Sequence, residues 1–305
     1  MALGTTRSYA VSQFEFSLEK EEPFHVKSIE GGLPKGNVVE EQIGTNVEFV
    51  KHLSTVDVEP LSIELGMQEA RSMLCWIQQS WNNDFCRKNG HVVHADFDYK
   101  QQFQYDFINA LITETTFPTL DAAGKEMAML KVKLQPEDVN FKKGGGPKLK
   151  AQAHNFQRQK MWPTSCFKFE LEGVDTSHVA KIEGFTVKQG VKSYHTGRAR
   201  YARWEPTKLT FPDLSVHVPF AYAGDLFDWY KESMDGAQDP SLQTTGSIVY
   251  LAPNKEDVVF EIELSGVGIK ALTIDKSERA ESVKRAKCDL YVSNMKLIVH
   301  GVKAW

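Results

Sequence analysis

The chain has 305 residues, which is enough for two domains of ordinary size or for one large domain. Hydrophobic residues make up 41% of it and charged residues 25%, and the net charge of −4 excludes a global positive field that would attract nucleic acid or an anionic membrane. No apolar run reaches the length of a transmembrane helix, and the N-terminal segment lacks the apolar core of a signal peptide.

The four cysteines are scattered along the chain, and none of them forms a CxxC motif. We expect them to be free thiols of a reducing compartment that pack as small hydrophobic residues. A disulfide between Cys75 and Cys86 is the alternative.

The first predicted strand, FEFSLE at residues 14–19, recurs as FKFELE at residues 167–172. An offset of 153 residues also aligns Leu61 with Leu214 and Trp76 with Trp229, without a gap. After small gaps in the alignment, residues 131–141 match residues 288–298. Because one offset holds over so many positions, we interpret the chain as an internal duplication.

The predicted elements follow the same order in both copies. The opening strand is followed by a short strand that is broken by glycine, and then by a long polar arm at residues 34–55 or 188–208. A strand with alternating apolar residues comes next, at residues 61–65 or 214–218, and an amphipathic helix follows within residues 66–81 or 220–234. Short strands and one long strand end each copy. This order predicts a mainly β (α+β) fold of two tandem antiparallel barrels or sandwiches, each with one flanking helix.

The predicted domain boundaries follow from the repeat. We expect a first domain at residues 1–143, a linker at residues 144–163 and a second domain at residues 164–305. The sequence KKGGGPKLK at residues 142–150 combines three glycines, a proline and four lysines, which is typical of a flexible, solvated connector.

Candidate chemistry is sparse. On a strand, His94, Asp96 and Asp98 share one face, and they could bind a metal ion in a metal-dependent enzyme. We favour a solvent-exposed polar face, since the second copy has no equivalent cluster. No nucleophile, phosphate-loop or zinc-protease motif is present. We therefore assign no catalytic, cofactor-binding or metal-binding residue, and we do not expect an enzyme.

The two arms differ in charge. The arm of the second copy is basic and aromatic, with Arg198, Arg200, Tyr201, Arg203 and Trp204. These residue types bind single-stranded nucleic acid, but they also dominate protein interfaces. The arm of the first copy is acidic and apolar, which nucleic acid would not explain. We therefore favour an interface in which the two arms meet between subunits.

Each copy resembles the tail tube protein of contractile-tail bacteriophages and related contractile injection systems. The resemblance lies in the opening FEF or FKFELEG strand, the HVxxIEG segment, the SYHTGRARYARW arm and the LSIEL or LSVHV strand. The helix that ends in LCWIQQSW or LFDWYKESM is its most specific part. Together these elements cover nearly the whole chain, twice.

The resemblance implies six small barrels that join edge to edge into a ring, with rings stacked into a tube. The family's common member has one copy, so this duplication suggests that three chains complete a pseudo-sixfold ring, and a hexamer is the alternative. The resemblance assigns the arms, residues 37–55 and 188–204, to ring stacking. Within them it points to Val38, Glu40, Glu41, Val47, Phe49, Tyr194, Arg198, Arg200, Tyr201, Arg203 and Trp204. It implies that the helices cover the barrel cores through Leu74, Trp76, Ile77, Leu226, Phe227 and Trp229.

The function implied is that of a virion structural protein, a tail tube subunit around a DNA-conducting lumen. A baseplate hub or tube initiator of the same fold is the alternative. The implied partners are further copies of the chain, the tail sheath, baseplate proteins and passing DNA, with no membrane and no cofactor. The implied location is the virion tail, after assembly in the bacterial host cytoplasm.

Overall fold

The computed structural model describes residues 13–19, 26–42, 49–67, 71–96, 99–145, 149, 162–197, 201–236, 239–274 and 284–300. The first half of the chain contains β1 (Gln13–Leu18), β2 (Val26–Gly31), β3 (Pro34–Gln42), β4 (Phe49–Val58), β5 (Leu61–Gly66), α1 (Arg71–Trp81), β6 (Lys88–Ala95), β7 (Gln101–Phe117), β8 (Leu120–Asp121), β9 (Met129–Gln135) and β10 (Asp138–Lys143).

The second half contains β11 (Phe167–Leu171), β12 (Lys181–Ile182), β13 (Phe185–Tyr194), β14 (Arg203–Thr210), β15 (Leu214–Pro219), the short 3-10 helix η4 (Phe220–Tyr222), α2 (Gly224–Asp235), the 3-10 helix η5 (Pro240–Leu242), β16 (Thr244–Leu251), β17 (Val258–Ile274) and β18 (Arg285–Val299). The prediction of a mainly β fold with one α-helix in each copy is confirmed.

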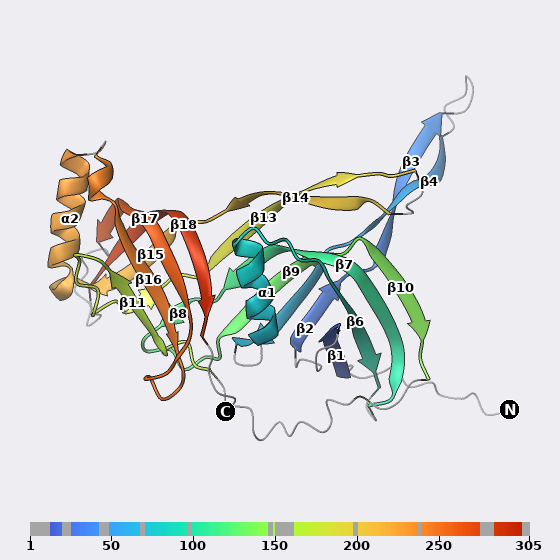
Figure 1. Ribbon diagram of the computed structural model, residues 1–305, viewed down its shortest axis with the longest axis horizontal. Helices are drawn as coiled ribbons and strands as arrows, with labels where there is room; N and C mark the ends of the chain where they lie inside the picture. Colours follow the sequence, from blue (N-terminus) through green and yellow to red (C-terminus); the bar gives the residue numbers. More distant parts are fainter. Residues whose placement is uncertain are drawn as a thin grey trace.

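Two curled antiparallel sheets lie side by side along the longest axis of the molecule (Figure 1). The first sheet has the order β1-β6-β7-β9-β5-β2, and the second has the order β11-β16-β17-β18-β15-β12-β8. Six successive strands of the two sheets therefore correspond in order. This agreement supports the internal duplication that the sequence predicts.

The strand ladders define which residues of the two halves are equivalent. The predicted alignment of Lys131 with Cys288 is wrong by one residue. In the ladders, Ile63 pairs with Val132 and its equivalent Val216 pairs with Cys288, so Val132 and Cys288 correspond at an offset of 156. The physical reason is the two-residue period of a strand, because a shift of one would align the exposed Lys131 with a fully buried thiol.

The long strands share an irregularity. The β7–β9 ladder shifts register between Ile112 and Glu114, and the β17–β18 ladder shifts between Ile269 and Ala271. These positions correspond at an offset of 157 residues, so both halves carry the same bulge. The two halves therefore correspond at an offset of 153 residues up to and including the helices and 157 in β7 and β17. The offset is 156 for β6 with β16 and for β9 and β10 with β18.

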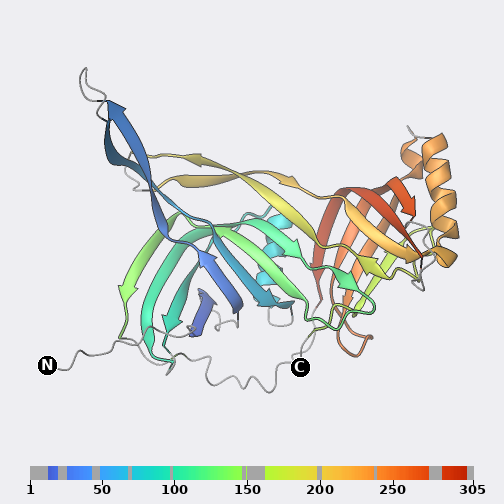
Figure 2. The same ribbon diagram turned by 180° about the vertical axis from the view of Figure 1, so that it is seen from behind.

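The two arms, which the sequence predicts only as long polar segments, are two-stranded ribbons. β3 and β4 form a separate hairpin that projects from one end of the molecule, and β13 and β14 run from the second half across the first (Figure 2).

The structure describes residues 142–145 and 149 of the KKGGGPKLK segment, and the linker at residues 144–163 stays a prediction. Lys142 and Lys143 belong to β10, and the Lys142 ammonium lies 2.6 Å from a carboxylate oxygen of Asp106. Leu149 is buried against Val93 and Ala95. Paired charge and apolar packing therefore fix residues that composition alone assigned to a solvated linker.

Candidate assembly interface between the two halves

Strands are exchanged between the two halves, and this exchange forms the main interface of the molecule. β13 of the second half adds to the edge of β7, with Phe185 opposite Phe117 and Lys188 opposite Glu114. In return, β8 of the first half pairs with β12. Each half thus completes an edge of the other half's sheet, and unpaired edges are what make isolated sheets prone to association.

Side chains along the β13–β7 ladder seal the junction. The rings of Phe117 and Phe185 stack with centroids 5.1 Å apart, and both side chains are buried. One position further along, the hydroxyl oxygens of Thr116 and Thr186 lie 2.9 Å apart. Aromatic pairs of this kind add about 0.5–1.5 kcal/mol to the effect of area burial alone.

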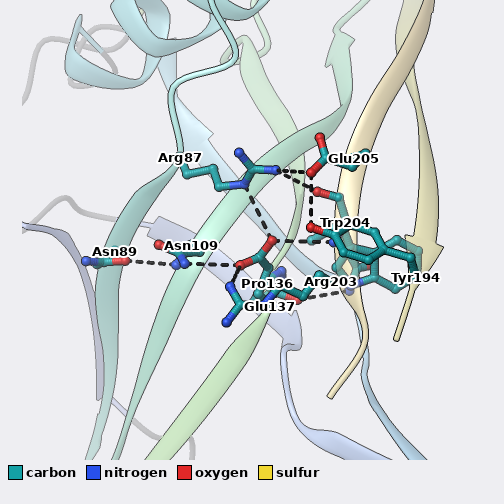
Figure 3. Close-up of polar contacts among 10 residues, drawn as sticks. Arg87, Asn89, Asn109, Pro136, Glu137, Tyr194, Arg203, Trp204 and Glu205 are labelled. Carbon is teal, nitrogen blue, oxygen red and sulfur yellow. Dashed lines mark hydrogen bonds and ion pairs between the residues drawn. The ribbon is translucent and has the colours of Figure 1, made fainter. Parts of the chain in front are cut away.

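A buried carboxylate links the arm of the second half to the first half (Figure 3). Glu137 lies between β9 and β10, where Pro136 interrupts the strand, and it is 7% exposed. Its Oε2 accepts hydrogen bonds from Arg203 Nη1 at 3.0 Å and from Asn109 Nδ2 at 3.1 Å. Arg87 Nε lies 3.5 Å from Oε1.

Backbone groups of the arm complete this arrangement. The backbone N–H of Trp204 donates to Glu137 Oε1 at 3.4 Å, and Arg87 Nη2 donates to the carbonyl of Trp204 at 2.8 Å. We call Arg87, Asn109, Glu137, Arg203 and Trp204 the Glu137 network. A buried carboxylate is tolerated only when it is paired and hydrogen-bonded, so this network holds β14 in one position on the first half.

Helix α1 lies between the two halves (Figure 1) and contacts β18 of the second half as well as β7 of its own. Its Trp81 ring meets Phe117 and Phe211 edge-on, with both centroid distances 5.9 Å. The indole N–H of Trp76 donates to the carbonyl of Cys86 at 2.7 Å. The helix predicted to cover one barrel core therefore also belongs to the junction.

The residues named for the helices are mostly buried. Leu74, Trp76, Ile77, Leu226 and Trp229 are each at most 8% exposed, and Phe227 is half-buried. Helical spacing places Leu74, Ile77, Leu226 and Phe227 on the apolar faces of their helices, whereas the resemblance to the tail tube family points to Trp76 and Trp229.

The residues named for the first arm lie on its projecting hairpin. Val38 and Phe49 are more than half exposed, and Glu40 and Glu41 are exposed as well. Val47 lies outside the described residues.

The residues named for the second arm divide into three groups. Arg203 and Trp204 contact the first half of their own chain through the Glu137 network, and Tyr201 is 7% exposed. Tyr194 is exposed and donates a hydrogen bond to Glu205 at 3.2 Å. Arg198 and Arg200 lie outside the described residues. The role of either arm in ring stacking stays a prediction.

Glu137 and Arg87 are not among the site residues predicted from the sequence. A buried acid cannot be distinguished from an exposed one in the sequence QPEDVN. The one available signal is the contrast between the copies, because Pro136 and Glu137 correspond to Val292 and Ser293. A position where a duplicated strand gains a proline and a charge indicates a local role that one copy alone performs.

The side chains of the alternative metal site, His94 and Asp96, contact other protein groups. Asp96 accepts hydrogen bonds from the backbone N–H of Lys100 at 2.9 Å and from Gln102 Nε2 at 2.7 Å. His94 stacks on Tyr105, and burial lowers the pKa of its imidazole. Asp98 lies outside the described residues. Within the described ranges, no group of three acidic, histidine or cysteine side chains has the arrangement of a metal site.

The remaining expectations concern the four cysteines and membrane-spanning helices. Cys75, Cys86, Cys166 and Cys288 are all free thiols, so the alternative disulfide does not form in this structure. No helix in the described part of the chain has the length and apolarity that crossing a membrane requires.

The fold and the junction define a class of protein: a tandem pair of antiparallel β modules that join edge to edge. Residues 12–140 match the family of the T4-like virus tail tube protein gp19. Residues 12–140 therefore belong to this tail tube family, and the second half of the chain repeats the order of their strands and helix.

Other comparisons find distant similarity. No curated protein matches the chain. Among solved structures, the PVC sheath–tube complex of an extracellular contractile injection system in the extended state is 16% identical with a TM-score of 0.39, over 46% of this chain and 94% of that one. The tube-terminating cap of the anti-feeding prophage is 16% identical with a TM-score of 0.40, over 47% and 96%. Hcp1 from Flavobacterium johnsoniae is 10% identical with a TM-score of 0.27, over 43% and 93%. The family assignment rests on the family match.

Proposed function

We propose that this protein is the tail tube subunit of a contractile tail, and that it polymerises into stacked rings around a lumen that conducts DNA. The observation that carries the proposal is the edge-to-edge exchange of β13 and β8 between the two halves. A junction that joins two similar modules head to tail can be repeated by further copies, and it closes into a ring when the rotation between modules allows it.

Three chains would supply the six modules of one ring in this proposal. Residues 1–143 and 164–305 are the two proposed domains, and residues 144–163 connect them. The projecting β3–β4 hairpin and the tip of β13–β14 would contact the next ring, and the sheath would surround the tube. The proposed location is the virion tail, after assembly in the cytoplasm of the bacterial host, with the baseplate at one end of the tube.

Sedimentation velocity and electron microscopy of the purified protein test this function together. We expect particles of three chains, each of 34.5 kDa, that stack into tubes of uniform diameter as the concentration rises. Discrete rings that never stack would instead support the hub or tube-initiator role. Single chains at every concentration would contradict both roles.

A further inference from the structure

The two ends of the molecule carry uncovered counterparts of the surfaces that meet at the internal junction. In that junction, the first half contributes the edge of β7 and helix α1, and the second half contributes β13 and β18. The corresponding elements at the ends are β17 and α2 on one side, and β3 with β9 and β10 on the other. Figure 1 shows α2 and the β3–β4 hairpin at opposite ends of the long axis.

Among the described strands, none pairs with the edge of β17 that corresponds to the edge of β7 filled by β13. β16 pairs with β17 only as far as Val267, so the segment up to Ile274 has β18 on one side and no described strand on the other. Ile274 is the equivalent of Phe117, and it is 45% exposed where Phe117 is fully buried. A long open edge with an exposed apolar side chain is a site for strand addition.

Helix α2 shows the same contrast with α1. Trp81 and Ile77 on α1 are 5% and 0% exposed, and α1 contacts β18 of the other half. Their equivalents on α2 are Met234, which is 44% exposed, and Tyr230, which is half-buried. Within the part of the chain that the structure describes, the apolar face of α2 is therefore less covered than the corresponding face of α1.

The first half carries the surface that corresponds to β13 and its surroundings in the internal junction. Leu33, the residue before β3, is 40% exposed, whereas its equivalent Thr186 contacts Thr116 across the internal junction. β2 pairs with β5 alone among the described strands, whereas its equivalent β12 has β15 on one side and β8 on the other. Phe49 on β4 is 55% exposed, whereas its equivalent Ala202 is buried.

We infer that a second copy of this chain docks on the open end of the first, and that its β3 adds to β17 in the register that β13 adopts on β7. This inference rests on the proposed ring and names the surfaces that form it. The register pairs Leu33 of the docking copy with Thr273, and Lys35 with Ala271. Helix α2 of the first copy then lies against the β9–β10 region of the second.

The junction between copies differs in chemistry from the junction within the chain. The charged residues of the Glu137 network have uncharged equivalents: Gln243 for Arg87, Ser293 for Glu137 and Val50 for Arg203. The junction between copies also contains Pro34, which has no backbone N–H to donate. The junction between copies therefore depends on backbone pairing and apolar contact, and dissociation releases whole chains with their internal junction intact.

Disulfide cross-linking tests the register. Leu33→Cys and Thr273→Cys are combined in one chain that also carries Cys75→Ser and Cys86→Ser. We expect oxidation to link separate chains into a covalent series that ends at three, because paired residues of adjacent strands lie within disulfide range. Leu33→Cys with Leu272→Cys, which is out of register, is the matched control and should give no linked chains.

A pair of cysteines at the internal junction is the positive control for disulfide formation. Thr116→Cys with Thr186→Cys should form a disulfide within one chain, since their hydroxyl oxygens already meet. If the Leu33 variant does not assemble when reduced, Lys35→Cys with Ala271→Cys replaces it on the same face.

The outcomes separate the inference from the proposed function. Rings that form without the in-register cross-link, or that link equally well out of register, overturn the inference and leave the ring standing. Absence of both rings and cross-links overturns the proposed function and the inference together.

Discussion

Loss of the Glu137 carboxylate should destabilise the chain by about 2–3 kcal/mol. Breaking a buried ion pair costs about 3–5 kcal/mol when the remaining charge stays buried. Here the side chains of Arg87 and Arg203 are 31% and 45% exposed, so both stay partly hydrated when the acid is removed, although Arg87 Nε is itself buried. The remaining cost comes from the unpaired Asn109 amide and Trp204 backbone N–H, at about 1–3 kcal/mol for such groups.

Urea denaturation of Glu137→Ala measures this cost, at a concentration where sedimentation shows single chains so that assembly adds no stability. A double-mutant cycle with Arg203→Ala should give a coupling energy of about 1 kcal/mol or more. Asp213→Ala is the matched control, because it removes the exposed ion pair with Lys270 and should cost less than about 0.5 kcal/mol. A Glu137→Ala cost no larger than that of the control, with no coupling to Arg203, would refute the reasoning.

Three further predictions concern single side chains. Phe185→Ala removes the ring stacked on Phe117 and should lower the free energy of unfolding by about 3–4 kcal/mol in urea; a loss below about 1 kcal/mol contradicts the stacked junction. A hydrogen bond from His217 holds the pKa of Glu183 below its ordinary value of 4.5, so its stabilising effect is present above that value and is lost as the pH falls through the lowered pKa. The melting temperature of Glu183→Gln should therefore fall less steeply in acid than that of the parent, and parallel curves would count against the pairing. Burial raises the pKa of the Cys288 thiol to about 12, so alkylation at pH 8 should be slow until urea unfolds the chain, and equal rates in both states would contradict its burial.

The repeat and the main elements could be predicted from the sequence because buried strands and helices impose their periods on it. The alternation in Leu61–Gly66 recurs in Leu214–Pro219 at the predicted offset, and both strands have the same burial pattern. Helical spacing likewise places Leu74, Ile77 and Leu226 on the buried faces of their helices. Such patterns depend on short-range geometry, which one chain segment contains by itself.

The arms and the register of the last strand could not be predicted in the same way. β3 and β4 form a hairpin with most residues exposed, so no buried face imposes a clear alternation on their sequence. The sequence alignment of the last strand in the two copies depends on where a gap is placed, and two placements differ by one residue. Only the strand partners of Val132 and Cys288 show which placement is right.

The junction itself is a long-range property. Glu137 and Arg203 are distant in sequence, and their contact depends on how the second half docks on the first. Similarly, Thr116 and Thr186 meet only because β13 of the second half pairs with β7 of the first half. No local pattern contains this information, although the differences between the two copies mark where it applies.

An end-on cryo-electron microscopy reconstruction of the assembled particle would show whether three chains form the ring. We expect six similar lobes around a pore with strict threefold symmetry, in which the lobes alternate between the first and second halves of three chains. A ring in which six chains each contribute one half to the inner wall, or a particle with no closed ring, would contradict it.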